Sequence, residues 1–382
     1  MRFIFLVIKA GIYVHIPFCK VKCIYCDFYS ITEKENSIER FTNAIIHEIK
    51  VCNVDVSKWE IDTIFFGGGS PSLLRGHQIE KIVSALSKKY DLSNIIESSI
   101  EVNPGEVSTE KLKLYKQFGI TRLSIGVQSF QPDLLKVLTR NHNRKDIFEI
   151  YNNARSIGFE NINLDLMHSI PGQTFELLEK DLDEIISLKP EHISAYSLTV
   201  EEDTELFPLV RDKTIKMHNG DKNTKFYHNT IESLTSHGYN LYEISSLSKP
   251  GMQCRHNLHY WHTEPYLGFG PSSHSYDNKY RWYNTKSLDV YLQNIESNKP
   301  VKMNEELLSN IDKVNETIGF GLRMSSGINL GKLPEDYRKK LKKTVIEAER
   351  KFSNCFKKTD HRIQLTSKGI LYADEIIAEL IF

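Results

Sequence analysis

Strand-like and helix-like stretches alternate six times in the first half of the chain, and this alternation constrains the fold more than any other feature. The strand candidates are short β-branched or apolar runs at residues 11–18, 61–66, 98–102, 122–127, 161–167 and 192–198. Segments with helical periodicity lie between them, at residues 37–51, 78–90, 109–118, 145–157 and 175–188. Strands that alternate with helices of this length predict an α/β fold with parallel strands. Six such units predict a partial (β/α)6 barrel of the TIM type.

The pattern changes after residue 200, which divides the chain into three predicted parts. Residues 1–200 form the predicted barrel. Residues 201–300 contain a charged stretch, a predicted helix at 226–237 and a segment at 239–283 that is rich in glycine, proline and aromatic residues. So many large aromatic side chains predict that this segment packs on the barrel or closes it. Residues 301–382 have amphipathic periodicity, for example at 305–320 and 367–380, and predict a small, mainly helical C-terminal domain.

Charge and cysteine content exclude several classes of protein. Lysine plus arginine and aspartate plus glutamate both number 49, so there is no basic excess for binding nucleic acid. Six cysteines in 382 residues predict a reducing compartment, with the cytoplasm as the default. Residues 1–8 resemble a signal peptide only weakly, because the apolar stretch ends at Lys9, and no stretch is long enough to span a membrane. Three isolated cysteines are expected to be ordinary buried residues: Cys52, Cys254 and Cys355.

The other three cysteines, Cys19, Cys23 and Cys26, lie together directly after the first predicted strand. Three thiolates on one short loop can hold three irons of a cubane iron–sulfur cluster and leave the fourth iron without a protein ligand. A structural zinc site is the alternative, with His15 or Asp27 as a possible fourth ligand. The spacing favours the iron–sulfur cluster and leaves zinc open.

Further polar and glycine-rich motifs follow the other predicted strands. Residues 66–72 read Phe-Gly-Gly-Gly-Ser-Pro-Ser, residues 101–104 read Glu-Val-Asn-Pro, and residues 126–130 read Gly-Val-Gln-Ser-Phe. Glycines let a backbone approach a ligand closely. Glu101 and Asp165 offer carboxylates to a ribose or an ammonium group, and Arg140 can bind a carboxylate with two hydrogen bonds. Because the carboxyl ends of barrel strands meet at one face, these side chains are expected to gather there.

Together, the CxxxCxxC spacing, the aromatic residue before its last cysteine and the strand-end motifs resemble the radical S-adenosylmethionine (SAM) superfamily. Over essentially the whole chain they resemble the oxygen-independent coproporphyrinogen III oxidase family. The resemblance implies a 4Fe-4S cluster on the three clustered cysteines, SAM bound to its open iron, and a partner that donates an electron so that SAM is cleaved. It implies SAM contacts at Tyr13, Tyr25, Gly68, Glu101, Arg140 and Asp165, and contacts to a second SAM at Gly69, Ser70 and Gln128.

Three features point to the heme chaperone branch of that family. Phe28 stands where the oxidases have a further cysteine, and only 18 residues precede Cys19, where the oxidases have a long extension. Residues 256–261 read His-Asn-Leu-His-Tyr-Trp and match the HNxxYW motif of the chaperone branch. The resemblance implies that the protein binds heme and passes it to acceptor proteins. His256 is the candidate axial ligand, with His259 and Cys254 as substitutes, and a hydrogen-bonded packing role for His256 is equally expected.

The sequence therefore leaves three candidate functions. The preferred one is a heme chaperone with a radical SAM core, which predicts stoichiometric heme binding without porphyrinogen decarboxylation. The second is a coproporphyrinogen III oxidase, which converts two propionates to vinyl groups and produces protoporphyrinogen IX. The third is a radical SAM enzyme that acts on another substrate.

Overall fold

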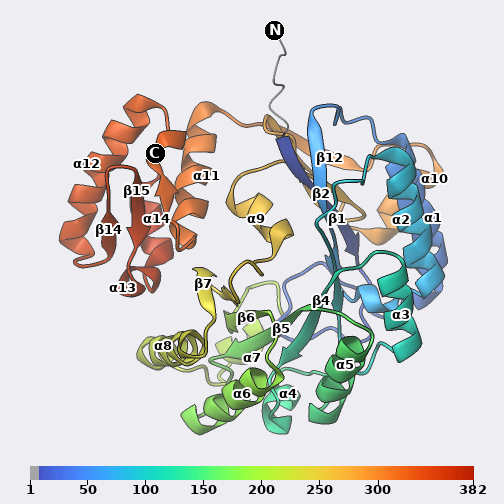
Figure 1. Cartoon of the computed structure of the whole chain (residues 1–382), viewed down its shortest axis with the longest axis horizontal. Helices are drawn as coiled ribbons and strands as arrows, with labels where there is room; N and C mark the ends of the chain where they lie inside the picture. The colour runs from blue at the N-terminus through green and yellow to red at the C-terminus, as the bar shows by residue number, and fades with distance from the viewer. Residues whose placement is uncertain (1–7) are drawn as a thin grey trace.

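Six parallel strands form the central wall of the molecule (Figure 1). The computed structural model describes residues 8–382, so the prediction about residues 1–8 falls outside it, apart from Ile8 at the start of the first strand. Each strand pairs in parallel with the next, which confirms the predicted α/β barrel-type fold. The strands are β1 (Ile8–Ile16), β2 (Trp59–Gly68), β3 (Glu97–Val102), β4 (Arg122–Gln128), β5 (Asn161–His168) and β6 (His192–Ser197).

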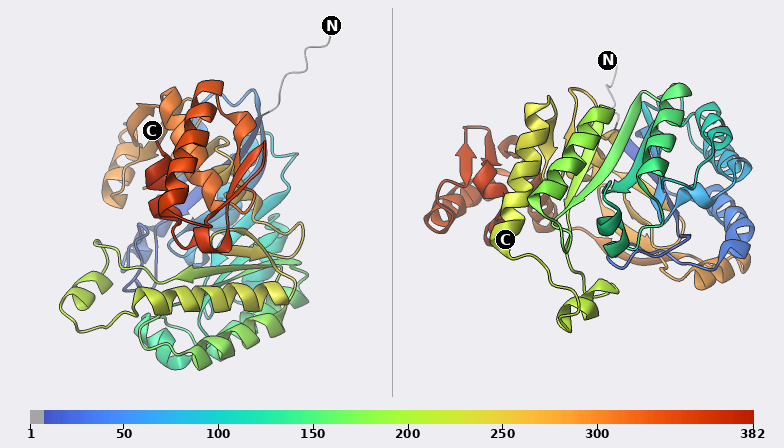
Figure 2. Two further views of the ribbon diagram at one scale, coloured as in Figure 1. Left: turned by 90° about the vertical axis from the view of Figure 1, so that its left-hand side faces the viewer. Right: turned by 90° about the horizontal axis from the view of Figure 1, so that it is seen from below.

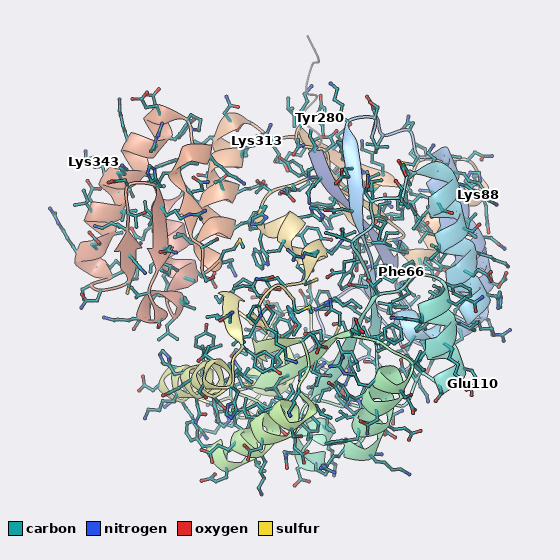
Figure 3. All side chains as sticks on the ribbon, viewed as in Figure 1. Phe66, Lys88, Glu110, Tyr280, Lys313 and Lys343 are labelled. Carbon is teal, nitrogen blue, oxygen red and sulfur yellow. The ribbon has the colours of Figure 1, made fainter. Side chains whose placement is uncertain are left out.

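Helices cover the outer face of this curved sheet (Figure 2). They are α1 (Ile38–Val51), α2 (Gly76–Lys89), α3 (Thr109–Gln117), α4 (Pro132–Val137), α5 (Arg144–Ser156), α6 (Phe175–Leu188) and α8 (Gly220–Ser236). The short helix α7 (Leu206–Arg211) lies apart from this layer (Figure 2), and its Leu206 N–H donates to the carbonyl of Ile24 at 2.8 Å. Each long helix buries one apolar stripe; in α1, for example, Phe41, Ile45 and Ile49 are fully buried. Phe66 lies inside the packed layer, whereas Lys88 and Glu110 lie at its periphery (Figure 3).

The sheet extends beyond the six strands at both edges. Next to β1 lie β9 (Tyr266–Phe269), β10 (His274–Tyr276), β11 (Tyr280–Asn284) and β12 (Lys302–Leu307), and next to β6 lie β8 (Ser246–Ser248) and β7 (Asn240–Glu243). The result is a sheet of 12 strands in which β6 pairs with β8 instead of closing onto β1. The aromatic-rich segment thus contributes strands to the sheet, and helix α9 (Arg255–Trp261) contacts β1 and β2. Helix α10 (Leu288–Glu296) packs against α1.

The C-terminal residues form a second hydrophobic core of their own, to one side of the main sheet (Figure 1). Its elements are α11 (Asn310–Arg323), β13 (Ile328–Asn329), α12 (Glu335–Lys351), β14 (Phe356–Lys358), β15 (Arg362–Leu365), α13 (Ser367–Ile370) and α14 (Ala373–Leu380). The three short strands form a separate sheet that the predicted helical periodicity did not indicate. Trp261 of α9 meets Phe320 of α11 edge to face at 6.0 Å between ring centres, which joins this part to the barrel.

Two predicted C-terminal helices differ from the observed elements. Residues 302–307 form β12 because they pair with β11, and α11 begins only after Ser309, whose side chain caps it by accepting from the Asp312 backbone N–H. The predicted helix at 367–380 is divided into α13 and α14. A division of the chain at residue 300 would therefore separate β12 from its sheet partner. Among residues 8–382, the longest apolar helices fall short of what crossing a membrane requires.

Candidate functional site

One cavity of about 500 Å³ opens at the carboxyl ends of the parallel strands. Residues from β1 to β6 and from the loops that follow them line it. It brings together nearly all the site residues that the sequence predicts: Cys19, Cys23, Cys26, Tyr13, Tyr25, Gly68, Gly69, Ser70, Glu101, Gln128, Arg140 and Asp165. His256 is the exception, because it does not line this cavity.

The loop with the three cysteines follows β1 and is fixed by backbone hydrogen bonds. The N–H of Cys19 donates to the carbonyl of Ile31 at 2.8 Å, and the N–H of Cys26 donates to the carbonyl of Cys23 at 3.0 Å. All three thiols are free and half-buried. Burial raises the pKa of Cys19 to about 11 and also raises the pKa of Cys26. Only the thiolate is a metal ligand, so a metal that binds here must displace the protons of these thiols.

The side chain proposed as a fourth zinc ligand is already engaged. The Nε2 of His15 donates to the carbonyl of Tyr29 at 2.9 Å, and its Nδ1 accepts from the Tyr13 hydroxyl at 3.0 Å. Within residues 8–382, no three His, Cys, Asp or Glu side chains converge on one ion-sized position. His15 is therefore not free to complete a zinc site, and an iron–sulfur cluster on the three thiols remains the prediction.

The glycine run after β2 lies directly against the cysteine loop. The backbone N–H of Ser70 donates to the carbonyl of Phe18 at 2.6 Å, and that of Gly68 donates to the Glu101 carboxylate at 3.1 Å. A Cβ on Gly69 would lie 2.6 Å from the carbonyl oxygen of Phe18 and 3.0 Å from the sulfur of Cys19. Only glycine permits this close approach, which explains why the run is needed here.

Arg140 connects the cysteine loop to the strand ends. Its Nη1 lies 3.6 Å from the Cys23 sulfur, and its Nη2 donates to Asn103 Oδ1 at 2.6 Å and to the Gly126 carbonyl at 2.7 Å. Asn103 in turn donates to the Ser70 hydroxyl at 2.7 Å. The Nε of Arg140 is buried and lacks a hydrogen-bond partner among the described residues. A permanent positive charge therefore stands beside the thiols, with one donor left for a ligand.

Two carboxylates face the cavity from β3 and β5. Burial, together with the nearby charge of Asp165, raises the pKa of Glu101 to about 8. Burial also raises the pKa of Asp165, although Asn163, whose Nδ2 donates to Asp165 at 2.7 Å, counteracts the rise. A ligand that brings a positive charge or hydroxyl donors would stabilise both ionised carboxylates. Gln128 ends β4 with a φ of 66°, in a bulge that turns the chain around the cavity.

His256 lies on α9 with a fully buried ring. Its Nδ1 is 2.9 Å from the Thr63 hydroxyl and its Nε2 is 2.8 Å from the Tyr260 hydroxyl, so both ring nitrogens are engaged. The ring also stacks on Phe65 at 5.2 Å between centres. Burial lowers the pKa of His256 well below its usual value, so the ring is neutral. This arrangement matches the packing role, and ligation of heme by His256 remains a prediction that would require these contacts to break.

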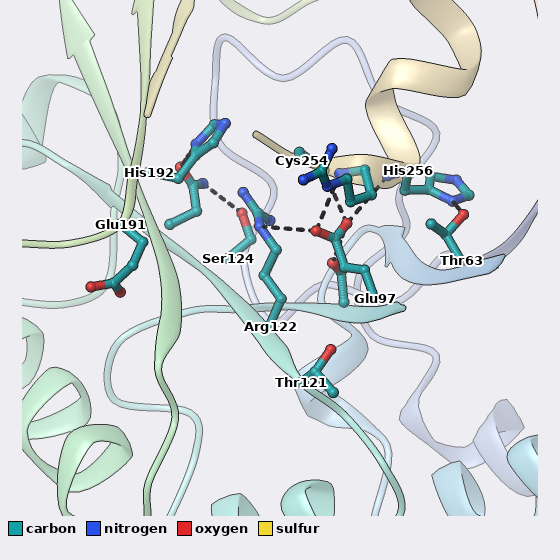
Figure 4. Close-up of polar contacts among 12 residues, drawn as sticks. Thr63, Glu97, Thr121, Arg122, Ser124, Glu191, His192, Cys254 and His256 are labelled. Atoms are coloured by element: carbon teal, nitrogen blue, oxygen red, sulfur yellow. Dashed lines mark hydrogen bonds and ion pairs between the residues drawn. The ribbon is translucent and has the colours of Figure 1, made fainter. Parts of the chain in front are cut away.

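The start of α9 is held by Glu97 at the beginning of β3 (Figure 4). The Glu97 carboxylate accepts from the backbone N–H groups of Arg255 and His256, both at 3.2 Å, and lies 3.5 Å from the Cys254 sulfur. It also lies 4.0 Å from the Nε of the buried Arg122. Helix α9 is therefore tied to the amino-terminal end of the barrel, opposite the cysteine loop.

His259, one turn after His256, is clamped between two carboxylates. Its Nε2 lies 2.7 Å from Asp62 and its Nδ1 lies 2.7 Å from Glu264. Burial lowers its pKa, but the hydrogen bonds and charges of Asp62 and Glu264 outweigh burial and raise the pKa to about 9. Both nitrogens of a protonated His259 donate hydrogen bonds, so this ring is likewise not free to bind iron.

We expect this clamp to make stability depend on pH. The pKa of His259 is higher in the folded protein than in the unfolded chain. Its contribution to the free energy of unfolding is therefore fully present below about pH 6.5 and is lost as pH rises toward 9. The loss amounts to about 3 kcal/mol. Denaturant unfolding of wild type and His259→Gln at pH 6 and pH 9.5 measures it: the difference between the two proteins should shrink at the higher pH. A constant difference, or one that His228→Gln reproduces, would contradict the clamp.

Several cavity residues lie outside the sequence motifs. Arg122 and Ser124 line the cavity together with Gly126 and Gln128 of the β4 motif, as residues two apart on one strand should. The same alternation places further residues there: Asn163, Ser194 and Tyr196. Counting back by two from the candidates Gln128 and Asp165 would have found Arg122, Ser124 and Asn163. Ser194 and Tyr196 of β6 and Asn257 of α9 have no candidate residue on the same element and gave no such signal.

Comparison with known proteins agrees with this geometry. Residues 13–185 match the model of the radical SAM superfamily. The chain is 33% identical over 368 residues to heme chaperone HemW of Bacillus subtilis (strain 168), covering 95% of this chain and 97% of the relative. It is 31% identical to heme chaperone HemW of Lactococcus lactis, and that match covers 97% of this chain and 96% of the relative. In structure it resembles coproporphyrinogen III oxidase (HemN) of Escherichia coli, with a TM-score of 0.84 and 22% sequence identity. The match covers 98% of this chain and 90% of the oxidase chain.

Proposed function

Since the chain belongs to the HemW family of radical SAM proteins, we propose that it is a heme chaperone that binds a 4Fe-4S cluster, SAM and heme and passes the heme to acceptor proteins. The observation that carries the radical SAM part is the single cavity that gathers the cysteine loop, the glycine run, Arg140 and the two carboxylates. The proposal that the protein binds and transfers heme is supported by the similarity to relatives named heme chaperone HemW.

We assign the cluster ligands to Cys19, Cys23 and Cys26. These three thiolates would hold the cluster, which would supply an open iron for SAM and, with an electron donor, the electron needed to cleave SAM. The protein contributes the environment: Arg140 beside the Cys23 sulfur offsets the negative charge of the thiolates. The Ser70 hydroxyl, 3.9 Å from the Cys19 sulfur, supplies a weak donor on the other side.

We assign the recognition of SAM to the rest of the cavity. Glu101 and Asp165 are placed to receive a ligand that carries positive charge and ribose hydroxyls, because both carboxylates are buried and incompletely neutralised. Tyr13, Tyr25 and Gly68 complete this set. The proposed positions for a second SAM line the same cavity: Gly69, Ser70 and Gln128.

The oxidase reaction is the second candidate. The likeness to HemN at 22% identity establishes a shared fold and carries no activity across. Phe28, which stands at the position of the oxidases' additional cysteine, lines the cavity and is 71% exposed. At this position the protein presents an exposed apolar ring to the cavity where the oxidases present a thiol. This difference favours the chaperone over the oxidase.

The experiment that separates these functions uses anaerobically reconstituted protein. One sample receives SAM, a reductant and coproporphyrinogen III, and a parallel sample is titrated with heme. We expect one heme bound per chain and no vinyl product. Formation of protoporphyrinogen IX would establish the oxidase, and cleavage of SAM with neither heme binding nor vinyl product would point to another substrate.

A further inference from the structure

A chain of buried hydrogen bonds leads from the edge of the sheet to Asp165 in the cavity that holds the cysteine loop. It begins at Tyr242 on β7, whose hydroxyl lies 2.8 Å from Nε2 of His192 on β6. The Nδ1 of His192 lies 2.6 Å from Oδ1 of Asn163 on β5, and Asn163 Nδ2 donates to Asp165 at 2.7 Å. Tyr242, His192 and Asn163 are all buried, so water does not compete for these bonds.

The amide of Asn163 is held from both sides of its strand. Its Nδ2 also donates to the Ser124 hydroxyl on β4 at 2.7 Å, and its Oδ1 also accepts from the Ser194 hydroxyl on β6 at 3.1 Å. His192 and Ser124 approach from the two neighbouring strands (Figure 4). Both amide hydrogens and both lone pairs of the amide oxygen are therefore used, which leaves the side chain in one orientation.

These contacts fix where each hydrogen of the chain lies. An ionised Asp165 only accepts, so Asn163 turns its Nδ2 toward Asp165 and its Oδ1 toward His192. His192 therefore carries its hydrogen on Nδ1, and its Nε2 accepts from the Tyr242 hydroxyl. Burial, together with the positive charge of Arg122, lowers the pKa of His192 well below its usual value, so the ring is neutral. Every donor in the chain thus points toward Asp165.

The surroundings of Asp165 act on its ionisation in opposite directions. Burial raises its pKa most strongly, and the hydrogen bond from Asn163 is the largest influence that lowers it. The Ser194 hydroxyl lowers the pKa as well. The ionisable groups that face Asp165 are Glu101 on β3, Arg122 on β4, Tyr196 on β6 and Arg140. Among all these neighbours, the Asn163 amide therefore does most to keep the carboxylate ionised.

We infer that Tyr242, His192 and Asn163 form a positioning relay that holds the Asp165 carboxylate in one orientation for SAM. This inference rests on the proposed binding of SAM in the cavity. Neither Tyr242 nor His192 lines the cavity, so both act through Asp165 and not on the ligand itself. A carboxylate that is already oriented accepts the hydroxyl or ammonium donors of SAM without first losing its own conformational freedom, which strengthens binding.

Removal of one hydroxyl group tests the relay. SAM affinity of the anaerobically reconstituted protein is measured by equilibrium dialysis with radiolabelled SAM between about pH 5.5 and 8.5. We expect Tyr242→Phe to weaken SAM binding about fivefold, because His192 can then move its hydrogen to Nε2 and no longer donates to Asn163. The pH below which SAM affinity falls should also be higher than in wild type, because Asp165 loses part of the hydrogen bonding that favours its ionised form.

Tyr239→Phe is the matched control, because it removes the hydroxyl of a similarly buried tyrosine three residues earlier. The Tyr239 hydroxyl donates to the Pro190 carbonyl at 2.9 Å, outside the relay. This variant should bind SAM as wild type does, with the same pH profile. If it reproduces the changes seen in Tyr242→Phe, those changes reflect general loosening of the sheet edge, and the relay is overturned.

Two substitutions at His192 separate positioning from packing. In His192→Asn the amide nitrogen stands near the place of Nδ1 and can still donate to Asn163, whereas His192→Leu removes the donor. We expect His192→Leu to weaken SAM binding about tenfold and His192→Asn to restore most of the affinity. Equal losses in the two variants would contradict a role for the donated hydrogen bond.

The outcome for Tyr242→Phe decides the relay even if His192→Leu does not fold. Wild-type affinity and pH profile in Tyr242→Phe would overturn the inference. If wild type itself binds no SAM, the proposed function fails. Normal SAM binding in wild type together with an unaffected Tyr242→Phe removes only the relay, so the two failures are distinguishable.

Discussion

Replacing Cys23 with alanine is expected to abolish the iron–sulfur cluster: the reconstituted protein should hold well under one iron per chain, against about four in wild type. Two remaining thiolates can anchor only two irons, and the variant leaves the Arg140 guanidinium beside an empty corner of the loop. The measurement is iron and sulfide content per chain, with the visible absorption of the cluster as a second readout.

Cys52→Ala is the control for this experiment, because Cys52 is also a half-buried free thiol but does not line the cavity that holds the cysteine loop. It should retain the full cluster. Full iron content and an unaltered cluster spectrum in Cys23→Ala would show that Cys23 is not a ligand. Equal loss in both variants would indicate that any thiol substitution disturbs reconstitution, and the assignment would lose its support.

The second large effect is expected from a single methyl group at Gly69. In Gly69→Ala the new Cβ would meet the Phe18 carbonyl at 2.6 Å and the Cys19 sulfur at 3.0 Å. The backbone has little room to retreat, because the Gly69 N–H donates to the Ile16 carbonyl at 2.8 Å. We expect the cysteine loop to shift, with at least a tenfold loss in cluster occupancy and a stability loss of about 1–3 kcal/mol.

Gly220→Ala gives the matched comparison, since no atom lies within 4 Å of the Cβ that it would add. Iron content and melting temperature of the two variants, prepared in parallel, measure the difference. If Gly69→Ala incorporates as much cluster as Gly220→Ala, the close packing of the glycine run against the cysteine loop is not needed to hold the cluster.

The parallel core and its site could be predicted because both depend on local patterns. Each end of the six strands was predicted to within three residues; β4, for example, was expected at 122–127 and spans Arg122–Gln128. Fully buried parallel strands are continuous apolar runs, which stand out in a sequence. Since such strands end at one face, the sequence alone is enough to place residues as distant as Cys19 and Asp165 in one cavity.

What could not be predicted depends on contacts between distant segments. Residues 302–307 are exposed and carry no distinctive pattern, so only their pairing with β11 makes them a strand. His256 looked like an available ligand because the sequence does not show that Thr63, 193 residues earlier, bonds to its ring. A second cavity, lined by His47 of α1 and by Leu267 and Trp282, likewise arises because α1 meets strands more than 200 residues later in the chain.

Electron paramagnetic resonance of the anaerobically reduced wild-type protein, recorded with and without SAM, tests whether one iron of the cluster is open to SAM. We expect about four irons per chain and a cluster signal that changes when SAM is added, because one iron would have no protein ligand. A zinc-containing protein, or a cluster whose signal SAM leaves unchanged, would contradict this expectation.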